Sequence, residues 1–319
     1  SAPSHPLTGT QRYCVLIHDP RGRPRTIRPS DDSRSSTRLD TLMVAGHFLM
    51  AFETAFVAAI SCLFLGVGFF KGNIASQVGE LFLPSGSGPF PVAVVFHGGY
   101  WKAMYDRSLM TDLCIDLAAH GLAAWNLEYR RVGSGGGWPG TFIDVAAGVD
   151  LLADLDAPLD LARVVSVGHS AGGQLAFWAA ARPTPAADAP GAEPRVRIVA
   201  AVSQAGVLDL GLAASLMPSS TPTRALLGDP VKNYERYVLA SPRERLPLGI
   251  PQLVLHGDRD DTVSLRIATS YASAARAVGD PCELVVLTHT GHYEHIDAGA
   301  EAWHVARDWL VAQASAARS

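Results

Sequence analysis

The chain has 319 residues, of which 48% are hydrophobic and 18% are charged, with a formal net charge of −4 and a pI near 6.2. This length and composition fit a globular protein with a sizeable core and exclude an intrinsically disordered chain. The slightly acidic charge gives no general attraction to nucleic acid or to anionic membranes, so we expect neither as a substrate.

The four cysteines are far apart in the sequence, at positions 14, 62, 114 and 282. None belongs to a Cys-x-x-Cys pair or has a histidine at metal-ligand spacing. The pattern therefore predicts ordinary thiols rather than a metal site or a disulfide framework.

The first 75 residues divide into a polar and an apolar part. Residues 1 to about 40 are rich in Pro, Ser, Thr, Arg and Asp and have little apolar periodicity, which predicts an irregular or disordered arm. Residues 42–70 are almost continuously apolar, and Thr54 to Phe70 is free of charge over 17 residues, near the lower limit of a membrane span.

Three interpretations of residues 42–70 stay open: a signal anchor, an export signal, or helices packed on the rest of the chain or on a second copy, as a lid or a homodimer contact. We expect a cytoplasmic protein, with membrane anchoring or export as alternatives.

From residue 76 to 319 the sequence alternates between strand and helix signals. The predicted strands are 78–83, 92–96, 122–127, 164–167, 198–202, 252–255 and 283–287, and the predicted helices are 109–119, 142–155, 265–278 and 300–314. This alternation predicts one α/β domain with a mostly parallel sheet covered by helices on both faces.

The sequence Gly168-His-Ser170-Ala-Gly172 follows the apolar strand 164–167 and opens a helical stretch. A serine on a tight turn between strand and helix projects its hydroxyl into the cleft, and the flanking glycines allow the backbones to pass closely. The pattern predicts a nucleophile elbow. The N–H of Ala171, at the start of the helix, would face a developing oxyanion.

Further polar residues follow the other strands, at the edge of the sheet where ligands bind. After strand 92–96 comes His97-Gly-Gly-Tyr-Trp101, in which the N–H groups of Gly99 and Tyr100 are the further candidate oxyanion donors. We expect His97 to hold this loop and Trp101 to line the substrate pocket.

Acids and histidines follow the last two strands. Three carboxylates compete after strand 252–255, at positions 258, 260 and 261, and three histidines follow strand 283–287, at positions 289, 292 and 295. We choose His292 as the general base because it follows a glycine just beyond the last strand. The adjacent Tyr293 is a second candidate pocket residue.

From about residue 77 to the end, these motifs resemble the α/β-hydrolase superfamily, close to hormone-sensitive-lipase-like carboxylesterases and kynurenine formamidase-like hydrolases. His97-Gly-Gly-Tyr-Trp is similar to the formamidase motif and departs from the His-Gly-Gly-Gly of the lipase-like esterases at Tyr100. The recurring pattern His-Gly-x-x-Asp-x-x-Val selects Asp260 as the acid. Ser170, Asp260 and His292 then follow the Ser…Asp…His order of the superfamily.

The resemblance implies a serine hydrolase that cleaves carboxylic esters of small to medium acyl chain through an acyl-enzyme, with no metal or organic cofactor. No long apolar lid is predicted between the elbow and Asp260, where the apolar stretch 208–217 is short. The alternatives are an arylformamidase or other amide hydrolase, and a hydrolase fold used for binding without catalysis.

Overall fold

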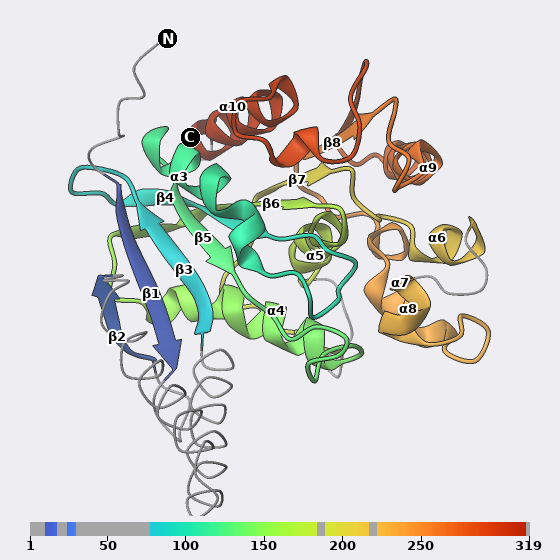
Figure 1. Ribbon diagram of the computed structural model, residues 1–319, viewed down its shortest axis with the longest axis horizontal. Coiled ribbons are helices and arrows are strands. Elements are labelled where there is room, and N and C mark those ends of the chain that lie inside the picture. Colours follow the sequence, from blue (N-terminus) through green and yellow to red (C-terminus); the bar gives the residue numbers. More distant parts are fainter. Residues whose placement is uncertain (1–9, 18–23, 30–76, 184–188, 217–221, 317–319) are drawn as a thin grey trace, which may run out of the picture. The chain divides into compact units, whose positions relative to one another are not determined.

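The computed structural model describes residues 10–17, 24–29, 77–183, 189–216 and 222–316 (Figure 1). The apolar segment 42–70 lies outside these residues, so its three interpretations stay predictions. Within the described residues, no helix is both long and apolar enough to cross a membrane.

The regular elements alternate along the chain much as the sequence predicts. The strands are β1 (Gln11–Ile17), β2 (Pro24–Pro29), β3 (Gln77–Leu83), β4 (Phe90–Phe96), β5 (Ala123–Leu127), β6 (Leu159–His169), β7 (Ala200–Gln204), β8 (Gln252–Gly257) and β9 (Cys282–Leu287). The α-helices are α3 (Thr111–Ala119), α4 (Gly140–Asp150), α5 (Ala171–Ala180), α6 (Leu210–Leu216), α7 (Pro222–Leu227), α8 (Tyr234–Ala240), α9 (Leu265–Ala277) and α10 (Glu301–Ala316). Short 3-10 helices are η2 (Arg107–Met110), η3 (Leu151–Asp154), η4 (Pro242–Arg245) and η5 (Glu294–Ile296).

Residues 79–319 form one compact unit, and β1 and β2 belong to a second. In the larger unit the strand order is β3-β5-β4-β6-β7-β8-β9. Strand β3 is antiparallel to β5, and every other neighbouring pair is parallel. The carboxyl ends of β4, β6, β8 and β9 therefore lie along one edge of the sheet.

Helices cover both faces of this sheet (Figure 1). On one face α3 and α10 pack on alternate residues of the strands, including Val95, Val165 and Leu253. The intervening residues face α5, where Ser166 Oγ donates a hydrogen bond to the carbonyl of Ala176 at 3.2 Å. Burial of the strands on both faces explains their nearly continuous apolar sequence.

Two parts of the fold differ from the sequence predictions. Residues 11–17 and 24–29, predicted to be irregular, form the antiparallel pair β1 and β2. The continuous apolar run Tyr13-Cys-Val-Leu-Ile17 carries a strand signal that the polar composition of the surrounding arm obscured. Helices α6, α7 and α8 were not predicted, because each has only six or seven residues and too few turns to establish a period.

Candidate active site

The turn after β6 places Ser170 in a conformation that few residues adopt. Its φ is 56° and its ψ is −118°, and its N–H donates to the carbonyl of Gln204 at 2.8 Å. A Cβ on Gly168 would lie 2.1 Å from the carbonyl oxygen of Gly172, and one on Gly172 would lie 2.1 Å from that of Phe96. Only glycine fits at either position, so the local sequence is dictated by the close approach of three backbone segments.

The loop after β8 buries the side chain of Asp260 completely. Its Oδ1 accepts the N–H groups of Thr262 at 2.9 Å and Val263 at 2.8 Å, and its Oδ2 lies 2.8 Å from Nδ1 of His292. The competing carboxylates of Asp258 and Asp261 belong to exposed residues. Asp260 is therefore the acid that contacts the predicted base.

These hydrogen bonds keep Asp260 ionised. Burial by itself would raise the pKa of this carboxyl, but the hydrogen bonds from His292 and from the N–H groups of Val263 and Thr262 outweigh it. The pKa of Asp260 lies below its ordinary value as a result. An ionised carboxylate can only accept, so Nδ1 of His292 is the donor. In the neutral imidazole the lone pair is then on Nε2.

His292 is buried, and its backbone is tied to the elbow. Its carbonyl accepts a hydrogen bond from Nε2 of His169 at 2.8 Å, so the residue before Ser170 holds the loop that follows β9. The pKa of His169 falls to about 3 because the ring is buried and lies near His292 and His295. His169 is therefore neutral at ordinary pH, and its ring links the two loops through this hydrogen bond.

The other two histidines of this loop have different surroundings. His289 is exposed, and its Nδ1 lies 2.6 Å from Nη2 of Arg259. His295 is fully buried, and neither of its ring nitrogens has a hydrogen-bond partner among the described residues. Neither histidine contacts Asp260 by a hydrogen bond, in contrast to His292.

The loop after β4 runs against the elbow. A Cβ on Gly98 would lie 2.9 Å from the carbonyl oxygen of His169 and 3.3 Å from Cβ of Ser170. Gly99, Tyr100 and Trp101 follow with φ values of 103°, 58° and 54°. Within the described chain, no acceptor takes the N–H groups of Gly99, Tyr100 or Ala171. These three donors are thus free to bind an oxygen beside Ser170.

His97 holds the base of this loop, as the sequence predicts. Its Nδ1 lies 2.8 Å from the carbonyl of Gly98, its Nε2 lies 3.1 Å from Oε1 of Glu128, and its ring stacks on Tyr129 at 4.3 Å. Glu128 also pairs with Arg131 at 3.4 Å. This buried network holds the start of the loop in place.

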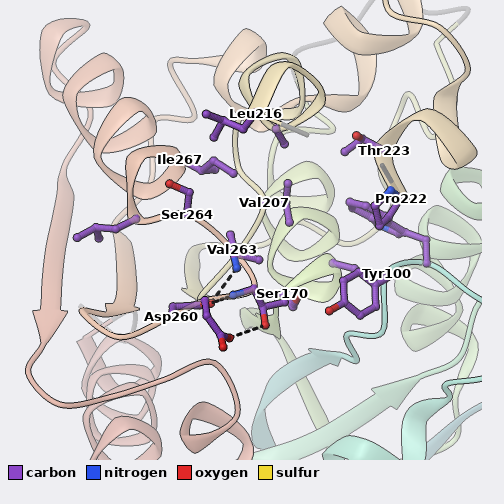
Figure 2. A pocket seen from close by; sticks show the side chains of 16 residues that line it. Tyr100, Ser170, Val207, Leu216, Pro222, Thr223, Asp260, Val263, Ser264 and Ile267 are labelled. Carbon is purple, nitrogen blue, oxygen red and sulfur yellow. Dashed lines mark hydrogen bonds between the residues drawn. The ribbon is translucent and has the colours of Figure 1, made fainter. Parts of the chain in front are cut away.

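A cavity of about 400 Å³ opens beside Ser170 and Asp260 (Figure 2). Its other lining residues, which are mostly apolar, are Tyr100, Trp101, Ala171, Val207, Ala213, Leu216, Pro222, Thr223, Asp261, Thr262, Val263, Ser264, Leu265 and Ile267. The predicted pocket residue Trp101 is among them. Tyr293 is not among them, and this residue is 61% exposed.

Much of the pocket wall was missed by sequence reasoning. Ala213 and Leu216 belong to α6, Pro222 and Thr223 to α7, and Ile267 to α9. Among the described residues between the elbow and Asp260, the short helices α6 and α7 build one side of the cavity. The apolar residues of 208–217 were the available sequence signal for this wall. Which of their side chains face the cavity depends on packing, which the sequence alone does not show.

Metal ligation has no candidate here. Among the described residues, no group of three or more His, Cys, Asp or Glu side chains is arranged to hold a metal ion. The polar groups at this end of the sheet include Ser170, the carboxylate of Asp260 bound to His292, and the backbone N–H groups of Gly99, Tyr100 and Ala171.

A mostly parallel sheet with a serine at a tight turn after β6, an acid after β8 and a histidine after β9 defines an α/β-hydrolase. The chain belongs to the BD-FAE family, whose model matches residues 80–274. It is therefore an α/β-hydrolase of an esterase family. Comparison with the curated proteins finds no match.

Solved structures share the fold at low sequence identity. A truncated carbohydrate esterase from gut microbiota is 18% identical, with a TM-score of 0.65 over 74% of this chain and 90% of that one. A thermophilic esterase of the Planctomycetes species Thermogutta terrifontis is 24% identical, with a TM-score of 0.58 over 73% and 87%.

An acetyl ester-xyloside bifunctional hydrolase of Caldicellulosiruptor lactoaceticus is 22% identical, with a TM-score of 0.58 over 73% of this chain and 88% of that one. All three structures are of ester hydrolases. The comparisons do not favour the formamidase alternative.

Proposed function

We propose that this protein is a carboxylesterase that cleaves esters of small to medium acyl chain through a covalent intermediate on Ser170. The observation that carries the proposal is the 2.8 Å contact between Nδ1 of His292 and the fully buried carboxylate of Asp260, at a cavity that Ser170 lines. Membership of an esterase family supports the same chemistry.

In the proposed mechanism, the imidazole acts in one tautomer. Asp260 accepts the Nδ1 proton of His292, which leaves the Nε2 lone pair to take the proton of Ser170. The serine oxygen attacks the ester carbonyl, and protonated His292 returns the proton to the departing alcohol. Asp260 stabilises the imidazolium that exists between the two transfers.

The oxyanion of each tetrahedral intermediate would rest on the N–H groups of Gly99, Tyr100 and Ala171. The positive φ of Gly99 and Tyr100 and the helix start at Ala171 support this role, since all three N–H groups are free of other acceptors in the described chain. Water then attacks the acyl-enzyme with His292 as the base, and the acid leaves.

The cavity supports the proposed size of the substrate. A volume of about 400 Å³ and a mostly apolar wall suit a group of several carbon atoms. The known esterase of Thermogutta terrifontis has been solved with butyrate bound, which is in the same size range.

The test is a panel of p-nitrophenyl esters of increasing acyl length, with N-formylkynurenine as the formamide substrate. We expect hydrolysis of the short and medium esters, and a loss of at least about 10³-fold in kcat for Ser170→Ala and Asp260→Asn. Asp258→Asn is the matched control, because this carboxylate is exposed and lies in the same loop as Asp260.

Labelling by a fluorophosphonate separates the enzyme from a binding protein with the same fold. The wild type should react at Ser170 and Ser170→Ala should not. Full ester turnover by Ser170→Ala, or faster turnover of N-formylkynurenine than of any ester, would overturn the proposal.

A further inference from the structure

The amide of Gln174 joins three elements next to the proposed active site. Its Oε1 accepts the indole N–H of Trp101 at 3.0 Å, and its Nε2 donates to the carbonyl of Ala240, at the end of α8, at 2.9 Å. The side chain is completely buried. Gln174 lies on α5 one turn after Ser170, and its N–H donates to the Ser170 carbonyl at 3.3 Å.

Trp101 belongs to the most unusual backbone segment in the loop after β4. Tyr100 and Trp101 are consecutive non-glycine residues with φ of 58° and 54°, directly after Gly99 with φ of 103°. Such residues hold this conformation only where surrounding contacts enforce it. This segment carries two of the three proposed oxyanion donors, so whatever holds Trp101 also sets their position.

Trp101 and its turn are held by few hydrogen bonds among the described residues. Its carbonyl accepts the N–H of Val132 at 2.8 Å, and Lys102 N–H closes a turn onto the carbonyl of Gly99 at 2.9 Å. Of these hydrogen bonds within the described chain, the one to Gln174 connects Trp101 to α5, the helix that follows Ser170. The indole is 2% exposed, so water cannot easily replace that bond.

We propose that Gln174 is a positioning residue that sets the distance between Ser170 and the oxyanion donors of Gly99 and Tyr100. This inference rests on the proposed esterase function. The geometry supports it because one rigid helix carries both the nucleophile and the amide, while the amide holds the strained loop through the indole of Trp101. The bond to Ala240 fixes the amide so that Oε1 faces the indole.

Gln174→Met keeps the length of the side chain and removes both hydrogen bonds. We expect kcat for p-nitrophenyl butyrate to fall about tenfold with little change in KM, since an oxyanion forms only after the substrate is bound. Trp101→Phe removes the other end of the bond and should lower kcat by a similar factor. The double variant should lose no more than either single variant, because both break the same link.

Trp178→Phe is the matched control. Trp178 lies on α5 one turn beyond Gln174, is also buried, and donates its indole N–H to the carbonyl of Leu239 at 3.0 Å. The Trp178→Phe substitution removes a hydrogen bond between α5 and α8, as Gln174→Met does, but it removes no hydrogen bond to the loop after β4. We expect Trp178→Phe to lower the midpoint of urea unfolding as Gln174→Met does, while its kcat stays at the wild-type value.

Two results would overturn the inference: a wild-type kcat in folded Gln174→Met, or losses in Gln174→Met and Trp101→Phe that multiply in the double variant. If the wild type hydrolyses no ester at all, the proposed function fails, and the link is then measured without catalysis. The Trp101 indole N–H, assigned by Trp101→Phe in ¹⁵N spectra, should exchange slowly with solvent in the wild type and faster in Gln174→Met. Equal exchange in both proteins would contradict the link itself.

Discussion

The strand ends with their loops and the helices α6 and α7 meet at one cavity, but they are built in different ways. Around the strand ends, backbone packs directly on backbone: a Cβ on Gly172, at the start of α5, or on Gly257, at the end of β8, would lie 2.1 Å from a carbonyl oxygen. In α6, a Cβ on Gly211 would meet a single atom, Oδ1 of Asp209, at 3.7 Å. The proposed chemistry therefore depends on backbone fit, and the pocket wall depends on side chains that can be exchanged.

The largest contrast should come from the same substitution in the two regions. Gly172→Ala places a methyl group where Phe96 and His97 carbonyl oxygens already lie, so we expect a loss of more than about 4 kcal/mol in stability, or failure to fold. Gly211→Ala lies at an exposed helical position and should gain about 0.5–1 kcal/mol. Urea unfolding of both variants measures the difference, and equal effects would refute the comparison.

Acid should weaken the strand-end region through a histidine that stays neutral in the fold. Burial and the neighbouring His256 and His292 lower the pKa of His295 to about 4, against about 6.5 in an unfolded chain. Between these values the unfolded chain binds a proton that the folded chain does not, so stability falls as the pH decreases, by at most about 1.4 kcal/mol per unit.

His295→Leu should remove this contribution. Between pH 7 and pH 5 we expect the variant to lose about 2 kcal/mol less than the wild type in its free energy of unfolding by urea. His289→Asn, at an exposed position in the same loop, is the control and should change the pH dependence little. An unchanged pH dependence in His295→Leu would show that this ring does not stay neutral.

The smallest effect should come from α6, where a substitution in the pocket wall should change the preference for acyl chain length. Ala213 lines the cavity from α6, so Ala213→Leu should fill part of it and lower kcat/KM for p-nitrophenyl octanoate relative to acetate by about tenfold. Ser215→Leu is the control, because Ser215 lies two residues on, is exposed and does not line the cavity. A parallel loss for both esters in Ala213→Leu would place the acyl chain elsewhere.

Much of the fold follows from patterns within the sequence. The strands and helices predicted for residues 76–319 all occur, with shifts of a few residues at their ends. A strand that is buried on both faces leaves a continuous apolar run in the sequence, and a helix that is buried on one face leaves a period. The glycines around Ser170 and the order of Ser170, Asp260 and His292 likewise identify the superfamily. By contrast, the β1 and β2 pair in the polar arm and the short helices α6 to α8 gave too weak a signal.

By itself, the sequence determined which residues could carry the chemistry, because a close backbone approach requires glycine, a hydroxyl nucleophile requires a residue such as serine, and the proposed base requires an imidazole. Only the tertiary structure decided which carboxylate contacts His292, that Tyr293 does not line the cavity, and that Gln174 accepts a hydrogen bond from Trp101. These depend on side-chain direction between segments that are distant in sequence, and packing rather than any local pattern sets that direction.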